Sequence, residues 1–176
     1  MKEVIKTLIP EDKLLERVKE IGNQLNEEYK NKEVVVVGVL KGSVIFMADL
    51  VRFMNMSVQL DFMDVSSYGD NTVSSGQLKI NKDLENSISD KHVILIEDIV
   101  DSGRTLKHLI AYLKGKSPAS IKLVTLLDKP ERRLFDVKAD IVGFDIPDEF
   151  VVGYGLDYAQ KYRNLPYIGV LEFIDE

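Results

Sequence analysis

The stretch that most restricts how this chain can fold is 92–105, which reads HVILIEDIVDSGRT. Val93–Ile96 is an uninterrupted aliphatic run, which is typical of a strand buried on both faces of a parallel sheet. Asp101-Ser102-Gly103 is a turn sequence, and the apolar residues after Thr105 recur at helical spacing. The stretch therefore predicts a strand, a turn and a helix, as in an open α/β sheet.

The turn after this strand predicts a ligand site, because ligands of open α/β sheets bind outside the carboxyl ends of the strands. Backbone N–H groups at the start of the following helix suit a phosphate. Glu97, Asp98 and Asp101 would repel a bare phosphate, but carboxylates also accept hydrogen bonds from vicinal hydroxyls and hold Mg²⁺. A ligand with all three features is a phosphorylated ribose.

An alternative interpretation is that Glu97 and Asp98 are a solvated strand end and that Asp101 or Ser102 only caps the helix. Three acids within five residues, followed directly by Ser-Gly-Arg-Thr, favour the ligand site over this interpretation.

The remaining aliphatic runs extend the α/β pattern along the chain. An amphipathic helix is expected from Pro10 to about Asn31, because apolar residues recur there at steps of three and four. Further strands are expected at 34–40, 58–62, 121–127, 139–144 and 167–173. The predicted fold class is therefore α/β, with a twisted, mainly parallel sheet flanked by helices on both faces.

The segment 66–76 contains mostly small or polar residues and lies between two strand-like segments. A polar loop of this length is uncommon in a compact domain unless it has a function. It predicts a lid that closes over the site and excludes water, and the alternative is a plain hairpin loop.

Composition excludes several classes of protein. A length of 176 residues suits one domain, and a net charge of −6 argues against a nucleic-acid partner held by bulk electrostatics. The absence of cysteine excludes disulfides and thiolate chemistry. The N-terminus lacks the apolar core of a signal peptide, and the aliphatic runs are too short to span a membrane. A soluble cytoplasmic protein with no membrane partner is expected.

The sequence IEDIVDSGRT, at 96–105, resembles the phosphoribosyl diphosphate-binding signature of the type I phosphoribosyltransferases. Nearly the whole chain resembles the bacterial 6-oxopurine (hypoxanthine-guanine) phosphoribosyltransferases. The narrower resemblance rests on Lys41-Gly42, on Ser67-Tyr68-Gly69, on Lys129, on Arg163 and on the string IPDEFVVGYGLDY at 146–158. It implies one domain, 1–176, with a core at about 34–144 and a small hood lobe, from the N-terminal segment and about 145–176, over the base site.

The resemblance also implies the roles of the residues that bind the sugar. The 5-phosphate is expected at the turn 102–105, the ribose hydroxyls at Glu97 and Asp98, and the purine N7 proton at Asp101, the expected catalytic residue. The Lys41-Gly42 turn is expected to carry a strained peptide bond. Phosphoribosyl diphosphate as a whole is expected to contact Lys41, Gly42, Ser67, Tyr68, Glu97, Asp98, Asp101, Ser102, Gly103, Arg104, Thr105 and Arg163.

On the purine side, the resemblance implies that Lys129 donates to O6, that Phe150 stacks on the base and that the Val151 backbone meets the pyrimidine edge. Glu131-Arg132-Arg133 is expected to be solvated surface. The expected purine-binding residues are Lys129, Phe150, Val151 and Asp157, and the expected ligands of the cofactor Mg²⁺ are Glu97, Asp98 and Asp157.

The reaction implied is Mg²⁺-dependent transfer of the 5-phosphoribosyl group from phosphoribosyl diphosphate to N9 of hypoxanthine or guanine, in purine salvage. The products would be IMP or GMP and diphosphate, and the assembly a homodimer or homotetramer. Two alternatives stay open: a regulator that binds phosphoribosyl diphosphate without turnover, and an enzyme of the same fold for adenine or a pyrimidine. Lys129 and the string at 150–158 favour an oxopurine.

Overall fold

A computed structural model describes residues 2–67 and 78–174. Its larger sheet has six strands in the order β4-β3-β2-β5-β6-β7, and every neighbouring pair is parallel except β3 and β4. The mainly parallel α/β fold class is therefore confirmed. The strands are β2 (Glu33–Leu40), β3 (Ser57–Ser67), β4 (Leu78–Lys82), β5 (His92–Val100), β6 (Ser120–Asp128) and β7 (Ile141–Asp145).

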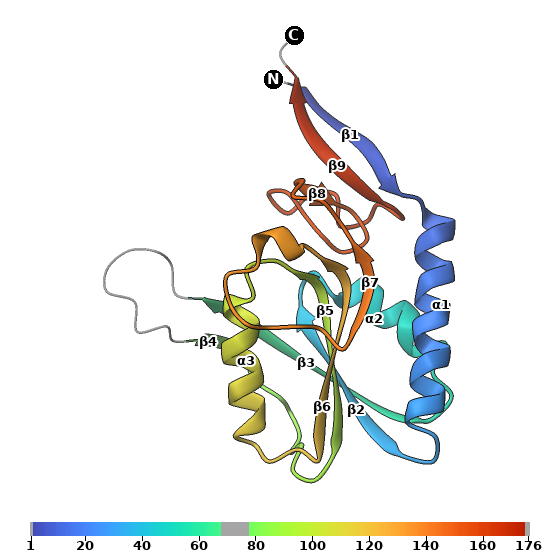
Figure 1. Cartoon of the computed structure of the whole chain (residues 1–176), viewed down its shortest axis with the longest axis vertical. Coiled ribbons are helices and arrows are strands. Elements are labelled where there is room, and N and C mark those ends of the chain that lie inside the picture. The colour runs from blue at the N-terminus through green and yellow to red at the C-terminus, as the bar shows by residue number, and fades with distance from the viewer. Residues whose placement is uncertain (1, 68–77, 175–176) are drawn as a thin grey trace.

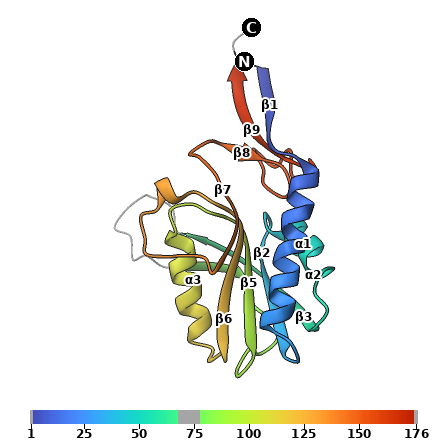
Figure 2. The same ribbon diagram turned by 45° about the vertical axis from the view of Figure 1, so that its right-hand side comes forward.

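Three α-helices cover the two faces of this sheet (Figure 1, Figure 2). The apolar sides of α1 (Glu11–Glu28) and α2 (Val44–Val51) pack in one core with β2, β5 and β6. Leu106, Leu109 and Leu113 of α3 (Arg104–Lys114) pack in a second core on the opposite face. In the described part of the chain, no helix is long and apolar enough to cross a membrane. The expected core range of 34–144 leaves out α1, whose buried Leu14, Val18, Ile21 and Leu25 belong to the first core.

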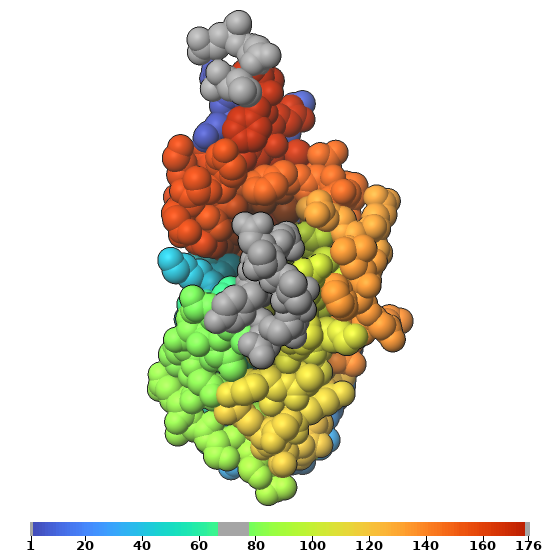
Figure 3. Space-filling model, turned by 90° about the vertical axis from the view of Figure 1, so that its left-hand side faces the viewer, coloured from blue at the N-terminus to red at the C-terminus, as the bar shows by residue number. Residues whose placement is uncertain are grey.

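A small antiparallel sheet forms the hood, in the strand order β1-β9-β8. It consists of β1 (Lys2–Ile9), β8 (Val151–Val152) and β9 (Ile168–Ile174). β1 and β9 form a ribbon that extends from one end of the molecule, and the orange and red C-terminal segments make up that end in the space-filling view (Figure 1, Figure 3). The strand β1 was not predicted, because most of its residues are exposed or half-buried and their pattern does not alternate regularly.

The strand β5 is longer than the aliphatic run that predicted it. The parallel ladder with β6 continues through the acids, pairing Glu97 with Thr125 and Val100 with Asp128. Because successive side chains of a strand point to opposite faces, this extension sends Glu97 and Asp98 to opposite sides of the sheet. The two acids therefore belong to different parts of the site.

Candidate active site

Two adjoining cavities open at the carboxyl end of β5. The first, which we call the turn cavity, has a volume of about 220 Å³, and the second, the hood cavity, about 330 Å³. Ile99 and Asp101 line both of them. The turn cavity is also lined by Val39, Val65, Glu97, Ser102, Gly103, Arg104, Thr105 and Leu106. The hood cavity is also lined by Asp98, Lys129, Arg132, Phe150, Val151, Leu156 and Asp157.

The turn cavity is built around the first turn of α3. Gly103 adopts φ +82, a left-handed conformation that glycine reaches without steric cost, and the helix begins at the next residue. The Ser102 hydroxyl accepts a hydrogen bond from Arg104 N at 3.4 Å, and the Ser102 carbonyl accepts two more from Leu134 N and Phe135 N. The turn is therefore fixed from both sides, with the start of a helix facing the cavity, and it suits an anion.

Glu97 and Asp98 are adjacent carboxylates that burial makes hard to ionise. Burial raises the pKa of Glu97 well above its ordinary value, and the charge of Asp98 raises it further. Burial raises the pKa of Asp98 to about 6, although Asp98 Oδ1 accepts a hydrogen bond from Ile99 N at 2.7 Å. Carboxylates that are costly to ionise are suited to a ligand that brings hydroxyl groups or a cation.

The turn that precedes α2 lies directly against Asp98. A Cβ atom added to Gly42 would lie 1.5 Å from Asp98 Oδ2, so only glycine fits between the turn and the carboxylate. A non-proline cis peptide bond joins Leu40 to Lys41. The unusual peptide therefore lies one bond before the Lys41–Gly42 peptide at which strain was expected.

Arg163 and Asp157 complete this side of the site from the hood. Arg163 Nη2 lies 2.8 Å from Asp157 Oδ1, and Nη1 donates to the Gly155 carbonyl at 2.7 Å. Both side chains also act electrostatically on Asp98, whose pKa Arg163 lowers and Asp157 raises. The structure thus brings Gly42, Asp98, Asp157 and Arg163 together at one point.

The predicted metal ligands do not form one cluster. Glu97 lines the turn cavity, whereas Asp98 and Asp157 line the hood cavity. Among residues 2–67 and 78–174, no three acidic or histidine side chains are close enough to hold a metal ion by themselves. Mg²⁺ in proteins is commonly held by one or two carboxylates together with substrate phosphates and water. Asp98 and Asp157 line one cavity and fit a magnesium ion that arrives with a phosphorylated ligand, and the set of three ligands that includes Glu97 stays a prediction.

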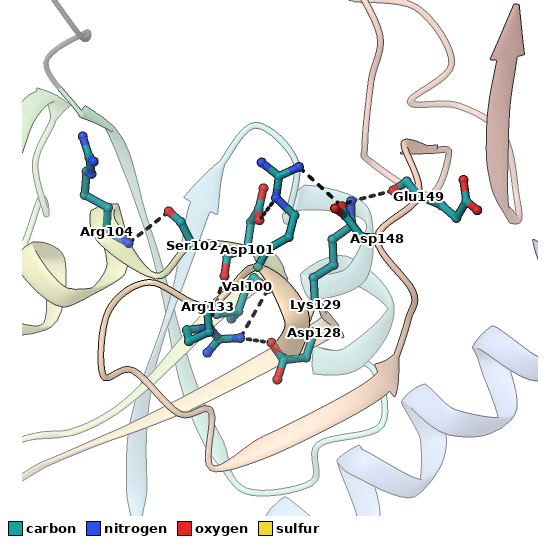
Figure 4. A network of polar contacts seen from close by, with 10 residues as sticks. Val100, Asp101, Ser102, Arg104, Asp128, Lys129, Arg133, Asp148 and Glu149 are labelled. Carbon is teal, nitrogen blue, oxygen red and sulfur yellow. Dashed lines mark hydrogen bonds and ion pairs between the residues drawn. The ribbon is translucent and has the colours of Figure 1, made fainter.

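The hood cavity combines an ammonium group with an exposed aromatic ring. The Lys129 side chain is 8% exposed, and its Nζ donates to the Glu149 carbonyl at 2.5 Å (Figure 4). Phe150 is 53% exposed and is held edge-on by Tyr158, at 5.8 Å between ring centroids. A planar, polar heterocycle could stack on Phe150 and accept a hydrogen bond from Lys129.

Of the three residues expected at the solvated surface, Glu131 and Arg132 are exposed, whereas Arg133 is largely buried, so the expectation was wrong for Arg133 alone. Arg133 is 18% exposed, pairs with Asp128 and donates from Nε to the Asp101 carbonyl at 3.1 Å (Figure 4). Arg132 lines the hood cavity, and the charge of Asp101 and then a hydrogen bond to Asp148 raise its pKa. Sequence reasoning also missed Ile99, Leu156 and Tyr158, although Ile99 stands between the acids of the signature and could have been noted.

Two expected contacts of the lid are not described. Ser67 is the last residue of β3, but its side chain and all of Tyr68 lie outside the described residues, as does the segment 68–77. The other expected site residues lie at the carboxyl end of the larger sheet or in the hood beside it.

Comparison with known proteins gives a family for this arrangement. The model of the phosphoribosyl transferase domain matches residues 7–159. The chain is 54% identical to the hypoxanthine-guanine phosphoribosyltransferase of Bacillus subtilis over 97% of this chain and 94% of that protein.

Two solved structures are similar throughout. A hypoxanthine phosphoribosyltransferase from Staphylococcus aureus superposes with a TM-score of 0.91 at 50% identity, covering 95% of this chain and 91% of that one. A hypoxanthine-guanine phosphoribosyltransferase from Bacillus anthracis gives 0.91 at 47% identity, covering 98% and 100%. The chain belongs to the phosphoribosyl transferase domain family and, within it, to the bacterial hypoxanthine-guanine phosphoribosyltransferases.

Proposed function

We propose that this protein transfers the 5-phosphoribosyl group of phosphoribosyl diphosphate to N9 of hypoxanthine or guanine, giving IMP or GMP and diphosphate. The observation that carries the proposal is the pair of adjoining cavities that share Ile99 and Asp101. One cavity offers a helix start to a phosphate, and the other offers Lys129 and Phe150 to a base. A nucleoside monophosphate carries a phosphate at one end and a base at the other, as these two cavities require.

The sugar end is held by the turn cavity. Backbone N–H groups and hydroxyls at Ser102–Thr105 bind the 5-phosphate, and Arg104 takes part through its backbone. Glu97 and Asp98 accept hydrogen bonds from the ribose hydroxyls, which offset the cost of their burial. The ribose C1 atom is thereby placed at the boundary between the two cavities.

The leaving diphosphate lies over the Lys41–Gly42 turn and beside Arg163, whose planar fork of donors suits phosphate oxygens. Ser67 and Tyr68 belong to the lid that closes on it in this proposal. Mg²⁺, when bound, neutralises charge on the diphosphate, and Asp98 and Asp157 are the residues that would hold it.

The base enters the hood cavity with O6 toward the Lys129 ammonium and one ring face against Phe150. The Val151 backbone meets its pyrimidine edge, and Asp157 lies at the same end. In the reaction the C1–O bond to diphosphate breaks, the C1–N9 bond forms, and the N7 proton passes to the Asp101 carboxylate. The protein contributes mainly position and charge, because diphosphate is already a good leaving group.

The test is nucleotide formation from phosphoribosyl diphosphate and Mg²⁺, with hypoxanthine, guanine, xanthine and adenine offered separately. Conversion of hypoxanthine or guanine, with adenine inert, is the expected result. Product with adenine alone would assign another base, and tight binding of phosphoribosyl diphosphate without product from any base would indicate the regulator. The proposal includes a cytoplasmic location. It also includes a homodimeric or homotetrameric assembly, and sedimentation of the purified protein would test that assembly.

A further inference from the structure

We propose that Arg132 is a positioning residue for this reaction, because its guanidinium group bridges Asp101 and Asp148 and fixes the Asp101 carboxylate beside the base. The inference rests on the proposed function, in which Asp101 accepts the purine N7 proton. It adds a residue from the loop that sequence reasoning placed on the solvated surface.

The bridge joins the turn after β5 to the segment that leads to β8. Arg132 Nε lies 2.8 Å from Asp101 Oδ1, in the turn after β5, and Arg132 Nη1 lies 3.3 Å from Asp148 Oδ1, in the segment leading to β8. Lys129 Nζ lies 3.9 Å from Asp148 Oδ1, and Lys129 lines the hood cavity together with Asp101 (Figure 4). The guanidinium group therefore acts where the base is expected.

The contact orients one oxygen of Asp101 and leaves the rest of the carboxylate open. Oδ1 is fully buried, and its contact with Nε is an ion pair rather than an aligned hydrogen bond. The Asp101 side chain as a whole is nevertheless 46% exposed, so the accessible part lies on its other atoms. A carboxylate that is covered at Oδ1 presents Oδ2 to a ligand.

The backbone beneath Arg132 is fixed, so the side chain reaches the cavity from a defined position. Lys129 N donates to the Val100 carbonyl at 3.0 Å, and Arg132 N donates to the Lys129 carbonyl at 3.1 Å within the 3-10 turn η1 (Pro130–Arg132). The next residue, Arg133, forms an ion pair with Asp128 and donates a hydrogen bond to the Asp101 carbonyl. An arginine is suited to this bridge because its planar fork can contact two carboxylates at once, whereas a lysine has a single ammonium group.

Replacing Arg132 can change activity without changing the stability of the fold, because the Arg132 side chain is 51% exposed. Ion pairs between exposed groups contribute little to stability, so replacing Arg132 should leave the melting temperature nearly unchanged. A loss of activity in such a variant would then report the position of Asp101.

The experiment is a double-mutant cycle of Arg132→Gln and Asp101→Asn, with steady-state kinetics for hypoxanthine and phosphoribosyl diphosphate. Arg132→Gln should lower kcat by about 10- to 100-fold, the size expected from a misplaced catalytic group, with the KM of phosphoribosyl diphosphate within about twofold of wild type. In the Asp101→Asn background, the same change should lower kcat by less than about twofold.

Two single variants serve as matched comparisons. Asp148→Asn weakens the contact of Arg132 with the hood, together with the 3.9 Å contact between Asp148 and Lys129, and should lower kcat in the same direction by a smaller factor. Lys138→Gln removes a positive charge from the same loop, at a groove shared with Lys107 and Lys114, and should retain wild-type kinetics.

The outcomes separate this inference from the proposed function. Wild-type kcat in Arg132→Gln, with Asp101→Asn impaired, would overturn the inference alone. An equal loss from Arg132→Gln in both backgrounds would show that Arg132 acts on the substrate directly, which also overturns positioning. Wild-type turnover in Asp101→Asn would instead remove the proposed role of Asp101, and absence of product from every base would remove the proposed function.

Discussion

The carbonyl oxygen of Gly42 occupies the place that a side chain at Gly155 would need. A Cβ atom added to Gly155 would lie 2.0 Å from Gly42 O, and Gly155 adopts φ +104, outside the range that other residues readily reach. The turn before α2 and the hood therefore meet backbone to backbone. The neighbouring Tyr154 hydroxyl, 2.5 Å from Asp49 Oδ2, joins the hood to α2 at the same point.

This contact predicts that Gly155→Ala displaces the Lys41–Gly42 turn. We expect a loss of about 1–3 kcal/mol in the free energy of unfolding from backbone strain, and a higher KM for phosphoribosyl diphosphate. Chemical denaturation and steady-state kinetics would measure both. Gly115→Ala, at the end of α3 with φ −63, is the control and should have a much smaller effect. Wild-type values for Gly155→Ala would show that the close contact is dispensable.

Asp101→Asn removes the proposed proton acceptor and keeps the shape of the side chain. Acid–base catalysis by a carboxylate contributes about 10²–10⁴-fold, so turnover should fall by that order while phosphoribosyl diphosphate still binds. Single-turnover kinetics and equilibrium binding would separate the two effects. Turnover near the wild-type value would mean that another group takes the N7 proton.

Asp98→Asn should stabilise the metal-free protein at neutral pH. The folded-state pKa of Asp98 is about 6, whereas the ordinary value is 3.8, so ionisation costs folding free energy as pH rises from about 4 to about 6. The full cost is about 3 kcal/mol, and it persists above pH 6. Denaturation in EDTA should show that the free energy of unfolding of the variant rises relative to that of wild type between pH 4 and pH 6. Above pH 6 the difference between the two should stay constant.

The matched change for that series is Asp145→Asn, which removes the charge of an exposed carboxylate at the end of β7. If the wild-type protein loses no stability relative to Asp98→Asn between pH 4 and pH 6, the raised pKa of Asp98 is contradicted.

Asp157→Ala removes a carboxylate that faces Asp98 and pairs with Arg163 at 2.8 Å. Because Asp98 and Asp157 are the proposed magnesium-holding residues, the variant should need a higher Mg²⁺ concentration for half-maximal rate and should bind diphosphate less tightly. A magnesium titration at saturating hypoxanthine would test this. A titration curve that coincides with that of wild type would remove Asp157 from the metal site.

Lys129→Gln should weaken recognition of the purine O6 atom. A hydrogen bond from a charged donor contributes about 1.5–3 kcal/mol, so kcat/KM for hypoxanthine should fall by about tenfold to a hundredfold, with a smaller change in the KM of phosphoribosyl diphosphate. Competition between hypoxanthine and adenine would give the specificity directly. An unchanged preference for hypoxanthine would mean that O6 is read elsewhere, for instance by backbone groups of the hood.

The parts of the site that lie within one strand–turn–helix unit could be predicted from the sequence, because local patterns determine them. The run Val93–Ile96, the turn at Gly103 and the helical repeat after it predicted the strand, the turn and the helix around the turn cavity. The extension of β5 to Val100 could not be predicted, since it depends on the ladder with β6 rather than on apolar character.

The contacts of Arg132 and Arg133 could not be predicted for a similar reason. Two arginines in a loop next to a proline have the composition of solvated surface, and only the fold brings Asp101, Asp128 and Asp148 to them. The backbone contact between Gly42 and Gly155 is likewise invisible in the sequence, because it joins two turns more than a hundred positions apart. The local unit was predictable, and the contacts across the hood were not.

The pairing of β1 with β9 also sets the order in which the two halves of the site can be completed during synthesis. Lys2 pairs with Ile174 and Thr7 with Gly169, so the ribbon joins the start of the chain to its last strand. Phe150 is supported by that strand, since its carbonyl accepts a hydrogen bond from Leu171 N at 2.9 Å. A nascent chain therefore contains β5, its turn and α3 well before it contains the platform for the base, so the base site is the last part of the site that can form.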